Sequence, residues 1–184
     1  MGTPGGSYAE YAIAWQYTTF HLPSSTTFEK AATLPLAAMI SAVGLYQRPG
    51  LPEPWSPAKP TGKQPLLVYS AASAVGAFAI QFAKLSGLHP IIGVAGRGIL
   101  FAESLIDKSE GVAIIDYRNS DEAVITGIKS ALKAAGCADI PLRYCFDSIS
   151  DNGSPENNSA ILDLKDGHVG GRAVQPHHGR LGAW

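Results

Sequence analysis

The regular alternation of short apolar stretches with helical patterns between residues 63 and 150 most constrains the fold of this chain. The apolar stretches are too short for helices and contain almost no polar residues, as is typical of strands buried on both faces. Strands are therefore predicted at residues 66–69, 90–95, 112–116 and 142–147. Helices are predicted at residues 77–85 and 100–108, and between Ser120 and Gly136.

Connections through helices of this length place successive strands parallel to one another. A parallel sheet whose strands are apolar on both faces needs helices on both faces. The sequence therefore predicts an α/β fold with a doubly wound, Rossmann-type parallel sheet.

The segments on either side of this region have different patterns. Residues 8–20 alternate large apolar and smaller side chains, which predicts an extended strand or strand pair. Thr26 and Glu29 have the spacing of a capping box, so a helix is expected to start near Thr27. Pro35 interrupts that run, and a second helix is expected at residues 36–46.

Two segments are expected to lack regular structure. Residues 51–62 contain four prolines, which predicts an extended surface loop. Residues 151–184 are interpreted as a poorly ordered tail, because the stretch from residue 167 contains paired glycines and histidines but few apolar residues.

Composition limits the classes of partner. The formal net charge is −1, with no long basic run, which argues against a nucleic-acid or anionic-membrane partner and favours a small molecule. Cys137 and Cys145 are the only cysteines, and this favours a reducing compartment, the cytosol. We expect no membrane-spanning segment, because no long apolar run is uninterrupted.

The turn after the first predicted strand is a candidate phosphate-binding turn. A dinucleotide pyrophosphate needs a tight turn there, close approach of the backbone and a helix N-terminus. Only the last of the usual glycines is present, and small residues replace the others, so an ordinary strand-to-helix turn is the alternative. The candidate residues are Ala72, Ser73, Ala74, Val75 and Gly76.

The turn after the second predicted strand bears on the choice of cofactor. A site for NAD usually places an acid there to hold the ribose hydroxyls, and residues 94–96 contain none. The turn reads Ala95, Gly96, Arg97, Gly98, and Arg97 can pair with a 2′-phosphate, so NADP is predicted. A solvated loop cation is the alternative for Arg97.

Two side chains after later strands have open roles. Tyr117 is expected either against the adenine ribose or as a surface aromatic residue. Asp147, at the end of the fourth strand, has the same two alternatives of a contact with the adenine ribose or a surface position.

Several other chemistries lack their motifs. No tyrosine is followed four residues later by lysine, as a short-chain reductase would require, and neither a G-x-S-x-G elbow nor a phosphate-binding P-loop occurs. His168, His177 and His178 have no cysteine or acid at a suitable spacing, so no metal site is assigned.

Several stretches together resemble the medium-chain dehydrogenase/reductase superfamily, in particular its zinc-independent quinone and enoyl reductase branch. Most similar are the trans-acting enoyl reductases that assist polyketide synthases. The resemblance is carried by residues 8–11, 31–38, 50–55, 68–76 and 116–118.

This resemblance implies a domain layout and a site. Residues 1–25 would be the remnant of a GroES-like substrate domain, residues 26–62 linking helices and a loop, and residues 63–150 the NADP-binding domain. The cofactor would contact the turns at 72–76 and 95–98 and Tyr117. Substrate and nicotinamide would lie beside the helix that carries Leu34, Ala38, Ile40 and Ser41.

The resemblance also implies an activity: NADPH-dependent reduction of an activated C=C bond in an enoyl thioester, a quinone or an enone. A polyketide synthase is the implied partner, and no oligomeric state is predicted. Residues 36–41 contain no cysteine, which disfavours a zinc dehydrogenase, and Ile40 replaces a usual threonine, so Ser41 would have to supply the hydroxyl. A catalytically silent NADP-binding fragment is the alternative.

Overall fold

The computed structural model describes residues 9–47, 49–57, 59–106, 113–151 and 153–171. The chain divides into two compact units, Met1–Pro35 and Leu36–Trp184.

The second unit is built around a five-stranded sheet. Its strands are β1 (Leu66–Tyr69), β2 (Ile91–Ala95), β3 (Ile114–Asp116), β4 (Tyr144–Asp147) and β5 (His168–Gly171). They lie in the order β3-β2-β1-β4-β5, and every neighbouring pair is parallel. The predicted Rossmann-type sheet is therefore confirmed, with β1 at its centre.

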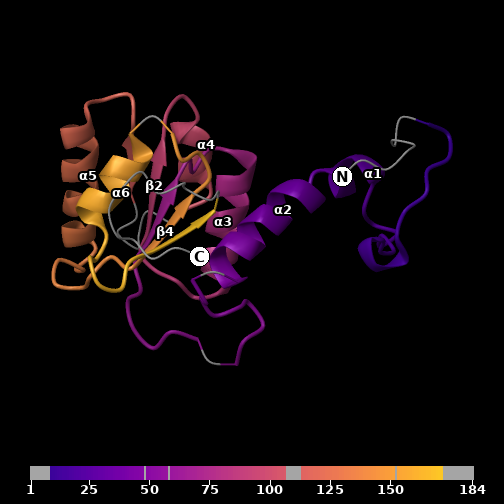
Figure 1. The fold of residues 1–184 in the computed structure, drawn as a ribbon, viewed down its shortest axis with the longest axis horizontal. Helices are drawn as coiled ribbons and strands as arrows, with labels where there is room; N and C mark the ends of the chain where they lie inside the picture. The colour runs from indigo at the N-terminus through magenta and orange to yellow at the C-terminus, as the bar shows by residue number, and fades with distance from the viewer. Residues whose placement is uncertain (1–8, 48, 58, 107–112, 152, 172–184) are drawn as a thin grey trace. The chain divides into compact units, whose positions relative to one another are not determined.

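Helices cover both faces of the sheet (Figure 1). Those on one face are α3 (Ala74–Leu85) and α4 (Ile99–Ser104), and those on the other are α5 (Asp121–Ala134) and α6 (Ser154–Ile161). Strand residues alternate between two cores: Leu66 and Val68 pack with α3, whereas Leu67 and Tyr69 pack with α5. Burial on both faces explains why these strands are continuous apolar runs.

Local sequence signals start the two long helices. The Ser73 side chain accepts a hydrogen bond from the Gly76 backbone at the start of α3, and the Ser120 side chain accepts one from Ala123 at the start of α5. Asp121 and Glu122 lie in the first turn of α5, where the helix dipole favours acids. The predicted cap at Ser120 is therefore confirmed.

A helix and a π-helical turn precede the proline-rich segment. The helix α2 (Pro35–Ala42) continues into η2 (Val43–Gln47), which contacts β5. Leu45 is buried in the core, and a Cβ at Gly44 would come within 2.6 Å of the Phe146 ring. This close approach requires glycine.

The 20-residue helical stretch Phe28–Gln47 is, by length and composition alone, apolar enough to cross a membrane, with a mean hydropathy of 1.3 over an 18-residue window. The expectation that no such stretch exists was therefore wrong on that criterion. Core helices of water-soluble proteins satisfy the same criterion when they are mostly buried, whereas 28% of this window is buried, with Leu45 at its end packed in the core. A cytosolic location stays a prediction.

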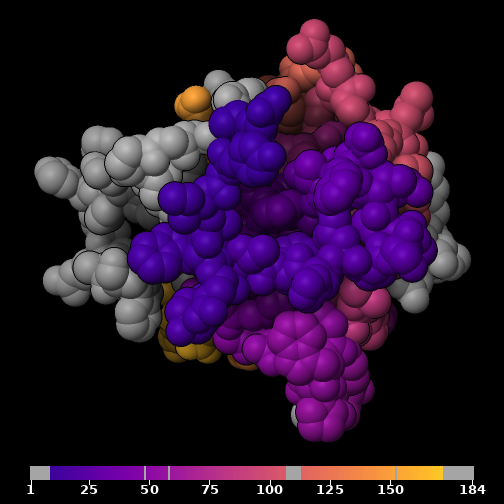
Figure 2. All heavy atoms as spheres, turned by 90° about the vertical axis from the view of Figure 1, so that its right-hand side faces the viewer, coloured from indigo at the N-terminus to yellow at the C-terminus, as the bar shows by residue number. Residues whose placement is uncertain are grey.

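The proline-rich segment forms no helix or strand in its described residues, 49–57 and 59–62. It extends from the second unit as a surface lobe, purple to magenta in Figure 2. Lys59 holds it in place, because its ammonium group donates to the Pro54 carbonyl and to the Leu85 carbonyl, each at 2.7 Å. Leu51 anchors the start of the lobe in the core.

The expectation of a poorly ordered tail over residues 151–184 was wrong for residues 154–171, which contain α6 and β5. Gly153 precedes α6 with φ of 79°, and Pro155 occupies its first turn. The strand β5 contains two glycines and obtains its order by pairing with β4, a contact that local sequence does not indicate. Residues 172–184, including His177 and His178, lie outside the described residues.

The first unit differs from the sequence prediction. Its described residues contain no strand; they form the short helix η1 (Gln16–Thr18) and the helix α1 (Phe28–Ala32). Ile13 is fully exposed, and no strand pairs with the described part of the segment predicted to be extended. Apolar alternation stabilises a strand only when a neighbouring strand pairs with it and its apolar face is buried. The cap of α1 is Thr27, not Thr26.

Candidate functional site

The carboxyl ends of β1 and β4 lie side by side at the point where the strand order reverses. The chain moves from β1 toward β2 and β3, and then returns to pair β4 on the other side of β1. Loops that leave β1 and β4 therefore diverge, and open α/β sheets bind their ligands in the crevice at such a reversal. The predicted phosphate-binding turn begins at this edge.

The turn from Ser70 to Gly76 has the tight geometry that a phosphate requires. Ser70 adopts a left-handed conformation with φ of 66°. The Ser73 hydroxyl donates to the Ser70 carbonyl and accepts from the Gly76 N–H, each at 2.9 Å. A Cβ at Gly76 would collide with the Ser70 carbonyl oxygen. The Ser73 hydroxyl thus closes the turn between two backbone groups, at the N-terminus of the 12-residue helix α3.

The second predicted loop lies against this turn. A Cβ at Gly98 would come within 2.6 Å of the Ala72 side chain, and one at Gly96 would come within 2.7 Å of the Tyr117 ring. The structure therefore brings the three predicted cofactor segments, at 72–76, 95–98 and Tyr117, to one edge of the sheet. Arg97 is exposed and forms no hydrogen bond or ion pair with any other residue that the structure describes.

A bidentate ion pair lies at the end of β3. The Arg118 guanidinium donates to both carboxylate oxygens of Asp116, with Nη2 at 2.6 Å and Nε at 2.9 and 3.1 Å. The hydrogen bonds from Arg118 lower the pKa of Asp116 to about 2. The carboxylate is therefore ionised and paired at neutral pH.

The loop after β4 contacts the predicted phosphate-binding turn. The Ser148 hydroxyl lies 3.4 Å from the Ser73 hydroxyl and donates to the Tyr69 carbonyl at 3.4 Å. Ser150 is also left-handed, with φ of 52°. Non-glycine residues in this conformation cluster at functional sites, and here one follows each strand at the reversal point.

Asp147 is fully buried at the end of β4 and has a structural role. One carboxylate oxygen accepts from the backbone N–H groups of Ile149 and Ser150, at 3.0 and 2.9 Å. The other accepts from the Ser154 hydroxyl at 2.7 Å and the Asn158 amide at 3.0 Å. These four bonds join β4, the following loop and α6, and they leave the carboxylate no exposed surface.

A second buried polar group joins α6 to the rest of the unit. The Asn157 amide donates to the Tyr69 hydroxyl at 3.1 Å and to the Asp121 carboxylate at 2.9 Å. Burial raises the pKa of the Tyr69 hydroxyl, which the nearby acids raise further. Tyr69 therefore stays protonated at neutral pH, and its hydroxyl links α6 to the end of β1, where the predicted phosphate-binding turn begins.

The predicted substrate residues fall into different environments. Ser41 is fully buried, and its hydroxyl contacts the carbonyls of Ala37 and Val75 at 2.8 and 2.7 Å. This hydroxyl ties α2 to the first turn of α3 and is not exposed to a ligand. Ile40 is 40% exposed and Ala38 is half-buried, whereas Leu34 belongs to the first unit.

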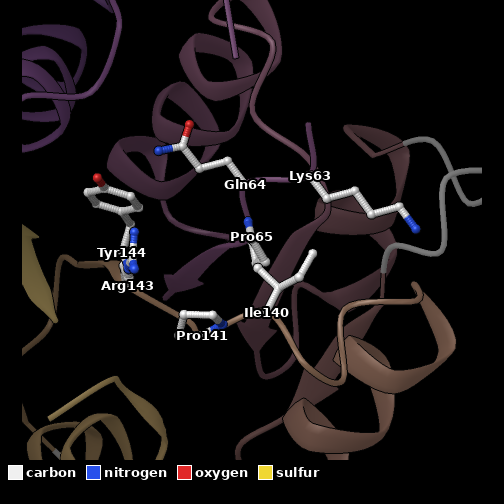
Figure 3. Close-up of a pocket in the computed structure, with 7 residues that line it drawn as sticks. All are labelled: Lys63, Gln64, Pro65, Ile140, Pro141, Arg143 and Tyr144. Atoms are coloured by element: carbon white, nitrogen blue, oxygen red, sulfur yellow. The ribbon is translucent and has the colours of Figure 1, made fainter. Parts of the chain in front are cut away.

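A shallow pocket of about 140 Å³ lies at the opposite edge of the sheet (Figure 3). It is lined by residues around the amino ends of β1 and β4, namely Lys63, Gln64, Pro65, Ile140, Pro141, Arg143 and Tyr144. It is therefore separate from the predicted cofactor segments. Within the described part of the chain, no group of three His, Cys, Asp or Glu side chains is placed to hold a metal ion.

Comparison with known proteins tests the resemblance seen in the sequence. No protein-family model matches the chain. The trans-enoyl reductase fsr4 of Gibberella fujikuroi is 44% identical over 166 residues, which cover 90% of this chain and 48% of that protein. The trans-enoyl reductase resD of Aspergillus sclerotiorum is 34% identical over 175 residues, 85% of this chain and 48% of that protein. The chain is similar in sequence to proteins named trans-enoyl reductases. It spans about half the length of these relatives.

Solved structures agree on the fold. An enoyl reductase, CurK, superposes with a TM-score of 0.60 at 22% identity, over 82% of this chain and 39% of that one. The Escherichia coli quinone oxidoreductase solved with NADPH gives a TM-score of 0.57 at 22% identity, over 83% and 43%. At this identity, the match of the chain to both structures concerns the sheet and its helices alone.

Sequence reasoning missed the polar contacts that support the site. Asp147 was seen only as a residue of open role, and its partners on α6 lay in the segment expected to be unordered. The start of α6 did carry a signal, because a glycine, a serine and a proline at residues 153–155 precede an acid in the first turn. The sequence did not indicate the left-handed conformation of Ser70 and Ser150, since serine is not among the residues enriched in that conformation.

Proposed function

We propose that the second unit binds NADPH and forms the cofactor half of a reductase acting on an activated C=C bond. One observation supports this most directly: the turn at 70–76, the loop at 95–98 and Tyr117 lie together at the sheet reversal. The absence of a Cβ lets the Ser70 carbonyl lie close to Gly76 and the Tyr117 ring lie close to Gly96. This backbone-lined edge fits a dinucleotide.

Each segment at this edge would bind a different part of the cofactor. The N-terminus of α3, with its cap at Ser73, would hold the pyrophosphate, and Arg97 would hold the 2′-phosphate. The Tyr117 ring would lie beside the adenine ribose. The cofactor supplies the hydride, and the protein orients it and keeps water away.

The substrate side rests on homology to proteins named trans-enoyl reductases. An enoyl thioester, or a quinone or enone, would receive the hydride at the carbon β to its carbonyl, and the enolate formed would then take up a proton from water. We place this substrate beside α2, near Ile40 and Ala38. A polyketide synthase is the proposed source of the enoyl thioester.

A catalytically silent NADP-binding fragment is the second candidate. It is favoured by one observation: the Ser41 hydroxyl, the proposed substitute for a threonine at position 40, is buried against backbone carbonyls. Fluorescence titration with NADPH, followed by oxidation assays with enones and enoyl thioesters, separates the two. Binding with turnover supports the reductase, binding without turnover supports the fragment, and no binding contradicts both.

Arg97→Ala tests the 2′-phosphate assignment. Loss of a charge-assisted contact should raise the Kd for NADPH about 10- to 100-fold, whereas the Kd for NADH, which lacks this phosphate, should change less than about threefold. Isothermal titration calorimetry with both cofactors measures this difference. Lys84→Ala is the control, because its side chain bonds the Leu105 carbonyl at the other end of α3. Equal losses for NADPH and NADH would contradict the assignment.

A further inference from the structure

The end of β3 carries an acid close to the proposed 2′-phosphate position. In the β2-β3 register, Asp116 lies directly beside Ala95, two residues before Arg97. The following N–H, that of Tyr117, donates to the Ala95 carbonyl at 3.1 Å, and the Tyr117 ring covers Gly96. Asp116 and the Arg97 loop therefore share one corner of the sheet.

An unpaired carboxylate at this corner would repel a 2′-phosphate. The two groups carry like charge, and Coulomb repulsion between charges at a protein surface extends over about 8–10 Å at ordinary ionic strength. An aspartate carboxyl without such a partner has an ordinary pKa of about 3.9, so it would still carry this charge at neutral pH. A site for NADPH therefore needs a counter-charge here.

Arg118 supplies that counter-charge. Its guanidinium contacts both oxygens of Asp116, and its backbone N–H donates to one of them at 2.9 Å. This arrangement fixes the turn from 116 to 118, and with it the tyrosine between the two charged residues. The acid is neutralised by the chain itself and not by the ligand.

We propose that Arg118 determines cofactor specificity by neutralising Asp116, and not by contacting the 2′-phosphate itself. The proposal rests on the NADPH site proposed above. In this arrangement Arg97 binds the phosphate, while the Asp116–Arg118 pair removes the repulsion that would otherwise favour NADH.

A double-mutant cycle on the 184-residue chain tests this role, with the Kd for NADPH and for NADH measured by calorimetry. Arg118→Met keeps the apolar stem but exposes the Asp116 charge, and should raise the Kd for NADPH about three- to tenfold with little effect on NADH. Asp116→Asn should leave NADPH binding equal or tighter, because an asparagine oxygen can still accept from the Arg118 N–H. The double variant should bind NADPH as the unmodified chain does.

Arg143→Met is the matched control. Arg143 pairs with Asp166 at 3.9 Å and lies at the amino end of β4, so this variant changes the net charge equally at the opposite edge of the sheet. It should leave both Kd values unchanged. Thermal unfolding of each variant checks that the fold is kept.

The outcomes separate this inference from the cofactor proposal. If the unmodified chain binds neither nucleotide, the proposed site fails. If it binds NADPH and the double variant stays as weak as Arg118→Met, Arg118 contacts the phosphate directly and the compensation role is wrong. An equal loss of NADPH and NADH affinity in Arg118→Met would also overturn it.

Discussion

Replacing Gly76 with alanine should abolish tight NADPH binding and destabilise the second unit. The new Cβ would collide with the Ser70 carbonyl oxygen, which the backbone of the turn holds in place. Relief of that collision must move the turn or the first turn of α3. We expect a loss of about 2–4 kcal/mol in the free energy of unfolding and a rise in the NADPH Kd on the order of 100-fold.

Gly62→Ala provides the matched control for this change. A Cβ at Gly62 has no heavy atom within 4 Å, so the same substitution should leave both stability and NADPH affinity close to those of the unmodified chain. Urea denaturation and fluorescence titration measure the two quantities. Wild-type affinity in Gly76→Ala would show that the turn does not hold the cofactor.

Replacing Asp147 with alanine should produce the largest loss of stability. Four donors lose their acceptor at once, two of them side chains of α6, and the site is fully buried. Leaving a buried polar network unsatisfied costs about 3–5 kcal/mol, enough to unfold a marginal domain. Far-ultraviolet circular dichroism during urea denaturation measures it.

Asp163→Ala is the corresponding control, because Asp163 repeats half of the same geometry at the surface. Its carboxylate accepts from the N–H groups two and three residues later, at 2.9 and 2.8 Å, just as Asp147 does. These backbone bonds lower its pKa, but solvent can replace them. We expect only a small change in the urea midpoint. If the two variants lose equal stability, burial of Asp147 is not the cause.

The sheet could be predicted from sequence because its strands are buried on both faces. A run such as Leu66 to Tyr69 has no polar residue to face solvent, so it is incompatible with a surface position. Capping residues then fixed the helix starts, as at Ser120. The same logic failed for residues 8–20, where a strand-like alternation exists without a neighbouring strand to pair with it.

The candidate site was predictable only in its backbone-determined part. The close contacts at Gly76, Gly96 and Gly98 leave no room for a side chain, so the need for glycine at these positions can be recognised in the sequence. The supporting contacts are not: the bond from Ser41 to Val75 joins residues 34 positions apart, and the bond from Asn157 to Tyr69 spans 88 positions. Such pairs depend on the sheet order, which no local pattern specifies.

The two buried cysteines allow local unfolding of the second unit to be detected by alkylation of their thiols. Cys137 follows α5, Cys145 lies within β4, and both are almost inaccessible to solvent. Burial shields both thiols from reagents and raises the pKa of each, that of Cys145 especially, so we expect alkylation to be slow while the unit stays folded. Alkylation rates therefore measure how often the unit opens, and mass spectrometry of the modified peptides distinguishes fraying at the end of α5 from separation of the central strands.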